Sequence, residues 1–130
     1  MNAPLLRMVD AVTLAVPDLD AGLFFYVDAL GHELLWRNDA IGQAGLRCPD
    51  GPTEIVLATA LPAEPNWLVD SADEAAATIA QAGGRIVAPA RDIPVGRVAV
   101  VEDPFGNRLV LVDLTKGRYP TRASAQLPEK

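Results

Sequence analysis

The sequence carries one short pattern twice, 53 positions apart. The first copy runs from Val16 to Gly31 and the second from Val69 to Gly84. Each copy begins with an apolar residue, continues with a residue that can cap a helix (Asp18 or Ser71) and ends in glycine. A repeat of this kind predicts a fold assembled from two equivalent modules.

Each copy lies within a predicted βαβββ module. In both, a short apolar strand precedes the capping residue, an apolar stripe at helical spacing follows it, and turn residues then separate three further strands. The predicted strands are 9–16, 33–37, 44–48, 53–59, 66–70, 85–88, 97–102 and 108–113. The expected fold is α+β, with two tandem βαβββ modules whose mixed sheets curl around a shared cavity.

The expected domain boundaries follow from this pattern. Residues 1–115 form one domain, with the first module at 8–60 and the second at 64–114, and residues 116–130 form an extended C-terminal tail. The proline-bearing segment 89–96 is interpreted as a flap over the cavity or as an ordinary loop.

Composition excludes several classes of function. A net charge of -6 argues against a nucleic-acid surface, which needs a basic stripe, and mildly favours a cationic ligand. No apolar run is long enough for a membrane span, and no secretory signal is visible. The single cysteine, Cys48, excludes an internal disulfide and suits a reducing compartment. We therefore expect a cytoplasmic protein without nucleic-acid or membrane partners.

Several motifs together resemble those of the vicinal oxygen chelate superfamily, which contains glyoxalases, bleomycin-resistance proteins and dioxygenases. They are the run 12–21 (VTLAVPDLDA), Phe25-Tyr26, Leu30-Gly31, and the turn 103–107 (DPFGN). The resemblance covers roughly residues 8 to 115. It implies a homodimer, but it does not fix a reaction, because this fold hosts lyases, isomerases, extradiol-type dioxygenases and non-catalytic drug binders.

The resemblance also implies four strand positions for ligands to one divalent metal ion. In this chain they fall on Ala11, Ile55, Glu64 and Val110. Three of these residues have no donor atom, and a divalent ion needs several protein donors. A one-residue shift of register would bring in Glu54 instead of Ile55, but strand alternation would turn Glu54 to the opposite face. We therefore expect no metal cofactor.

Strand alternation assigns a mostly apolar ligand-binding wall. Its predicted members are Thr13, Trp36, Ile55, Leu57, Glu64, Asn66, Arg108 and Val110. No catalytic residue is assigned. His32, the only histidine, is interpreted as a partly exposed residue at the start of a strand, and Cys48 as an inert thiol.

Three functions remain open at this point. The first is a metal-free protein, similar to bleomycin-resistance proteins, that binds a small cationic or aromatic molecule. The second is a divalent-metal-dependent lyase, isomerase or dioxygenase. The third is a structural or regulatory partner protein.

Overall fold

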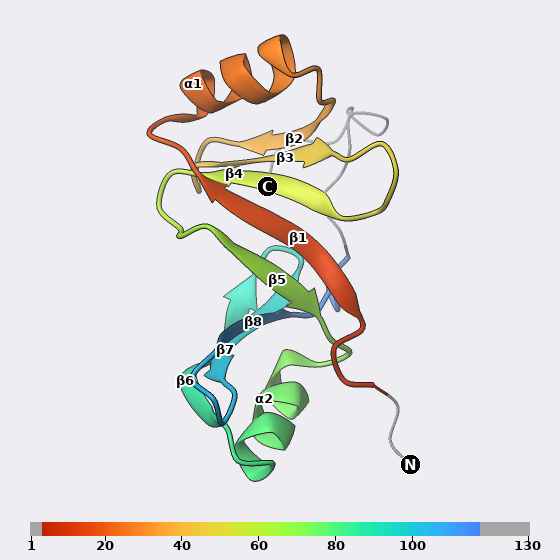
Figure 1. Ribbon diagram of the computed structural model, residues 1–130, viewed down its shortest axis with the longest axis vertical. Coiled ribbons are helices and arrows are strands. Elements are labelled where there is room, and N and C mark those ends of the chain that lie inside the picture. The colour runs from red at the N-terminus through yellow and green to blue at the C-terminus, as the bar shows by residue number, and fades with distance from the viewer. Residues whose placement is uncertain (1–3, 118–130) are drawn as a thin grey trace. The chain divides into compact units, whose positions relative to one another are not determined.

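The computed structural model describes residues 4–117, which contain eight strands and three helical segments (Figure 1). The fold is α+β, as predicted. The chain divides into two compact units, which we call the N-terminal unit (residues 11–64) and the C-terminal unit (residues 4–10 and 65–117). Each is described by itself, and the shared cavity stays a prediction.

The N-terminal unit is the first βαβββ module. Its strands lie in the order β2-β3-β4-β1, with β1 parallel to β4 and the other neighbours antiparallel. Figure 1 shows α1 lying over this sheet. The elements are β1 (Met8–Ala15), whose residues 8–10 belong to the C-terminal unit, α1 (Leu19–Leu23), the π-helical η1 (Phe24–Ala29), β2 (Leu34–Asn38), β3 (Gln43–Arg47) and β4 (Glu54–Ala58).

The helix covers only one face of that sheet. Leu19 of α1 packs there against the fully buried Ala44, Leu46 and Leu57 of the strands. Leu14, Val16 and Tyr26 are among the partly buried residues that complete this cluster. The helix therefore fixes which side of each strand becomes core.

The C-terminal unit is built in the same way. Its strands lie in the order β5-β8-β7-β6, with β5 parallel to β8. Its elements are β5 (Glu64–Leu68), whose first residue belongs to the N-terminal unit, α2 (Ala72–Gln81), β6 (Arg85–Ile93), β7 (Gly96–Glu102) and β8 (Arg108–Val112). The helix α2 packs close to β6 and β7 through Ala72, Ala75 and Ala76, as its alanine-rich face predicts.

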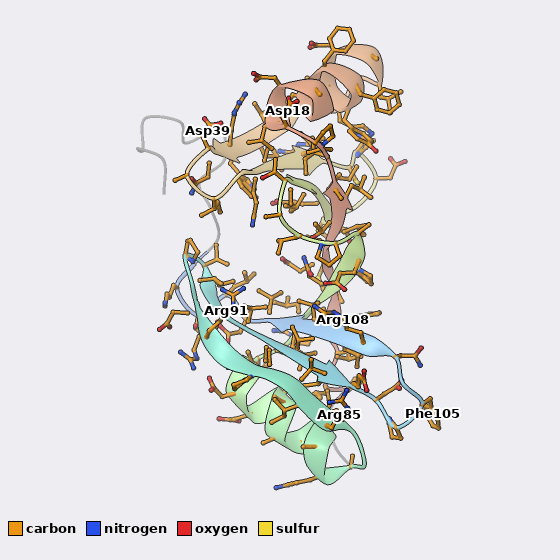
Figure 2. The ribbon with its side chains drawn as sticks, turned by 90° about the vertical axis from the view of Figure 1, so that its left-hand side faces the viewer. Asp18, Asp39, Arg85, Arg91, Phe105 and Arg108 are labelled. Atoms are coloured by element: carbon orange, nitrogen blue, oxygen red, sulfur yellow. The ribbon has the colours of Figure 1, made fainter. Side chains whose placement is uncertain are left out.

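The repeat in the sequence corresponds to a repeated helix start. Asp18 accepts a hydrogen bond from the Ala21 N–H at 2.7 Å, and Ser71 accepts one from the Glu74 N–H at 3.2 Å. Both predicted caps are thus confirmed, and Figure 2 shows Asp18 at the beginning of α1. Each cap satisfies a backbone donor that the first helical turn leaves without a partner.

An aspartate two residues after each cap ties the helix to its sheet. Asp20 pairs with Arg37 of β2 at 3.1 Å, and Asp73 pairs with Arg97 of β7 at 2.7 Å. These pairs are partly exposed, so each adds at most about 1 kcal/mol. Their main effect is to orient the start of the helix over the sheet.

Segment 89–96, expected as a flap or an ordinary loop, is mostly strand. Strand β6 continues to Ile93, and its pairing with β7 ends at Ile93 opposite Gly96. Pro89 is accommodated because β6 is the outermost strand and its register shifts between Ala88 and Arg91. A proline without an N–H is tolerated on an edge strand or at a bulge.

The predicted tail lies almost entirely outside the described residues. Of residues 116–130, the structure describes 116 and 117. The Lys116 N–H donates to the Val95 carbonyl at 2.9 Å, so this part lies against the turn between β6 and β7. Within residues 4–117, no helix is long and apolar enough to cross a membrane.

A buried carboxylate joins three elements of the C-terminal unit. Asp113 follows β8 and is 2% exposed. Its Oδ2 accepts from the Ala72 N–H at 2.8 Å, and its Oδ1 accepts from the Arg97 N–H at 3.0 Å and from the Thr115 hydroxyl at 2.8 Å. A side chain at Gly96 would overlap the Asp113 carbonyl. This carboxylate therefore connects the starts of α2 and β7 to the end of β8.

The hydrogen bonds decide the protonation state of this group. Burial alone would raise the pKa of Asp113, but the donors at Ala72, Thr115 and Arg97 favour the charged form and bring its pKa below the ordinary value. A carboxyl whose pKa falls on folding stabilises the folded state above its unfolded pKa of about 3.9. That contribution disappears as the pH falls through the folded pKa.

We predict that Asp113→Asn lowers the free energy of unfolding at pH 7 by about 1–3 kcal/mol. Whichever way the amide is turned, its NH₂ group faces a backbone N–H that then lacks an acceptor. Urea denaturation at pH 7 measures the loss.

The pH dependence supplies the control. The difference in unfolding free energy between the unmodified chain and Asp113→Asn should shrink as the pH falls from about 5 to 2, because the Asp113 carboxyl is then protonated and is uncharged like the Asn side chain. Asp70→Asn, which alters a largely exposed pair with Arg7, should change stability little at any pH. A pH-independent difference for Asp113→Asn would contradict the prediction.

Candidate functional site

The face of the N-terminal sheet that α1 does not cover is the candidate site. Ala11, Leu35, Trp36 and Val56 form a buried cluster there, separate from the cluster under α1. Ala11 lies opposite Glu54 in the β1–β4 pairing. We call this surface, comprising Ala11, Thr13, Trp36, Glu54 and Val56, the helix-free face.

The predicted face of two site residues was wrong. Ile55 pairs with Val12 and Leu57 with Leu14, and both pack in the cluster under α1. Because neighbouring residues of a strand point to opposite faces, it is Glu54 that shares a face with Ala11. The prediction for β4 was therefore one residue out of register, since the register depends on hydrogen bonds to strands far away in the sequence.

The carboxylate of Glu54 is held by an indole. Trp36 Nε1 donates to Glu54 Oε1 at 2.9 Å, and Trp36 is 7% exposed. Glu54 is partly buried. Trp36 was expected on the ligand-binding wall, and the structure adds a defined contact that the sequence did not reveal. Thr13, also expected there, is 2% exposed.

The remaining predicted site residues are more dispersed. Asn66 pairs with Val110 across β5 and β8, while the flanking Trp67 and Leu111 pack under α2. Asn66 and Val110 thus lie on the face that α2 leaves uncovered. Arg108 is exposed at the start of β8 (Figure 2), and Glu64 is partly buried at the start of β5. Their roles in binding stay predictions.

The donor set does not fit a tightly held metal ion. Among the described residues, no three His, Cys, Asp or Glu side chains lie close enough together to hold one. Of the four positions that the resemblance implies, Glu64 alone carries a donor atom, and the observed register adds the Glu54 carboxylate opposite Ala11. A divalent ion needs more protein donors than this for stable binding.

His32 lies elsewhere in the N-terminal unit. Its Nδ1 is 3.0 Å from the Arg47 carbonyl, and it borders a shallow hollow of about 310 Å³ with Leu30, Glu33 and Pro49. Arg47 is occupied by an ion pair with Glu33 at 2.9 Å. His32 is therefore a partly exposed residue before β2, as expected.

Two mycobacterial proteins resemble the chain in sequence. They come from Mycobacterium bovis and Mycobacterium tuberculosis, and both are named "Putative glyoxylase CFP32". Each is 34% identical over 96 residues, which cover 69% of this chain. The chain spans 37% of the length of these curated relatives.

Solved structures share the fold. Methylmalonyl-CoA epimerase from Mycobacterium tuberculosis has a TM-score of 0.65 at 26% identity, covering 87% of this chain and 92% of that one. A Streptomyces coelicolor methylmalonyl-CoA epimerase in complex with 2-nitronate-propionyl-CoA has a TM-score of 0.62 at 23% identity, covering 85% and 99%. The protein BH1468 from Bacillus halodurans has a TM-score of 0.63 at 19% identity, covering 81% and 92%.

A family model matches nearly the whole of both modules. Residues 8–111 match the model described as Glyoxalase/Bleomycin resistance protein/Dioxygenase superfamily. The tandem βαβββ architecture and the structural relatives agree with that match. The chain belongs to the Glyoxalase/Bleomycin resistance protein/Dioxygenase superfamily.

Proposed function

We propose that this protein binds a small cationic or aromatic molecule in a mostly apolar cavity, without a metal ion held by the protein. The helix-free face would form one wall of that cavity, and Glu54 would supply its principal polar contact. The observation that supports this most directly is the Trp36–Glu54 hydrogen bond on an otherwise apolar surface.

The chemistry of this face favours such a ligand. Small-molecule sites are mainly apolar and use a few fixed polar groups for orientation. An ionised carboxylate only accepts hydrogen bonds, so its partner must be a donor or a cation. Glu54 is partly buried, which strengthens a pairing with charge relative to one in open water. The net charge of -6 also favours the approach of cations.

A homodimer and a cytoplasmic location belong to the same proposal. The resemblance to the superfamily supports the homodimer, and the single cysteine supports the cytoplasmic location. Size-exclusion chromatography with light scattering would measure the oligomeric state directly.

We predict that Glu54→Gln weakens binding of a cationic aromatic amine by about 10- to 100-fold, because a charge-assisted contact is worth about 1.5–3 kcal/mol. Isothermal titration with benzylammonium, phenethylammonium and benzamidinium measures the affinity. Benzoate, matched in size but negatively charged, should bind weakly to both forms.

Glu33→Gln is the matched control for that substitution. Glu33 belongs to the same unit but is exposed and paired with Arg47, so its loss should leave amine binding unchanged. Equal affinity of the unmodified chain and Glu54→Gln for every amine would overturn the proposed role of Glu54.

A second candidate function is a divalent-metal-dependent enzyme of the same superfamily. The methylmalonyl-CoA epimerase structure from Mycobacterium tuberculosis favours it by its fold and 26% identity. The donors in this chain do not fit such a metal site, so we derive no reaction step from it.

Metal analysis separates the two functions. We predict well below one divalent ion per chain in protein purified without chelators, because no cluster of three suitable side chains occurs among residues 4–117. Elemental analysis by mass spectrometry measures the content. A stoichiometric ion that Glu54→Gln or Glu64→Gln removes would favour the enzyme over the metal-free binder.

A further inference from the structure

We infer that Trp36 is a positioning residue for the Glu54 carboxylate. We also infer that Gly45, which has no side chain, leaves the space in which the Trp36 indole reaches Glu54. The inference rests on the proposed function and narrows its ligand class. A carboxylate held in this way selects a molecule that presents an ammonium, amidinium or N–H group, and it rejects carboxylates and phosphates.

The strand order makes this contact a long one. Trp36 on β2 lies opposite Gly45 on β3, and Glu54 lies on β4, the next strand over. Neighbouring strands are about 4.8 Å apart, so the side chains must close a gap that spans two strand intervals, roughly 10 Å. The indole therefore extends across β3 to reach Glu54 at 2.9 Å.

Gly45 is required for space and not for backbone conformation. Its φ is not among the positive values found at Gly31, Gly42 and other glycines. A Cβ added at Gly45 would overlap Trp36 Nε1 and would stand 2.8 Å from Trp36 Cδ1. Any side chain here would have to displace the indole, because real Cβ atoms do not approach that closely.

The contact also couples the two side chains energetically. Trp36 is 7% exposed, and a buried indole N–H that loses its acceptor destabilises the fold. Rotation of Glu54 away from Trp36 removes this acceptor, so the bond restrains the carboxylate. Since an ionised carboxylate only accepts hydrogen bonds, a ligand of Glu54 must present a cation or an N–H group.

The indole proton gives a direct spectroscopic readout. The chain contains two tryptophans, Trp36 and Trp67, so ¹⁵N-labelled protein should show two indole N–H signals, assigned with Trp67→Phe. We predict that Glu54→Gln shifts the Trp36 signal, because the indole N–H then faces a neutral amide in place of a carboxylate. The signal of Trp67, which packs against the α2 core, should not shift.

A pair of glycine substitutions tests the role of Gly45. Gly45→Ala should move the Trp36 signal towards that of a solvent-exposed indole and weaken benzylammonium binding about tenfold or more. Gly51→Ala is the matched control, because a Cβ there meets no atom within 4 Å. It should leave both the signal and the affinity unchanged.

Trp36→Phe keeps an aromatic ring but removes the N–H donor. This second variant is needed because Gly45→Ala could change the signal simply by misfolding. Circular dichroism verifies that both variants fold. We expect Trp36→Phe to remain folded and to lose at least about threefold in benzylammonium affinity relative to Trp67→Phe.

The outcomes separate the positioning role from the proposed function. A Trp36 signal that neither Glu54→Gln nor Gly45→Ala changes would overturn the inference. Equal amine affinity in the unmodified chain and Trp36→Phe would also overturn the inference. The proposed function would survive that result, because the amine would still bind. A responsive Trp36 signal without any amine binding would instead remove the proposed function and leave the contact as a feature of the fold.

Discussion

In each unit one helix covers one face of a four-stranded sheet, and almost every other feature follows from that. A strand points successive side chains to opposite faces, so the covered face fixes the side of each residue. Leu57 points to the face under α1 and is part of the core. Glu54, three residues earlier on the same strand, points to the opposite face. The apolar core and the candidate site are therefore the two faces of the same sheet.

The two modules begin their helices with the same kind of side-chain cap, but they differ in the interactions that attach each helix to its sheet. Asp20 and Asp73, at corresponding places in the repeat, each pair with an arginine of the sheet. The C-terminal unit adds the buried Asp113, which accepts hydrogen bonds from three segments at once. A buried carboxylate stays charged only when donors surround it, and that requirement fixes the local geometry.

The helix-free face of the N-terminal unit combines an apolar surface with one restrained carboxylate. The superfamily supports several reactions and also simple binding, so the fold does not select among them. Ala11 and Val110 carry no donor atom, and the Trp36–Glu54 contact spans Gly45. On these features we base the proposal that this face binds a donor or a cation.

The sequence by itself determined the module repeat, the helix caps at Asp18 and Ser71, and the α+β class, because these depend on contacts between near neighbours in the chain. It did not determine the register of β4 or the extent of β6. Register depends on hydrogen bonds between strands far apart in sequence, and one residue of error exchanges Ile55 for Glu54. The contact of Trp36 with Glu54 was likewise decided only by the tertiary structure, because it needs three strands in place and the absence of a side chain at Gly45, where the indole lies.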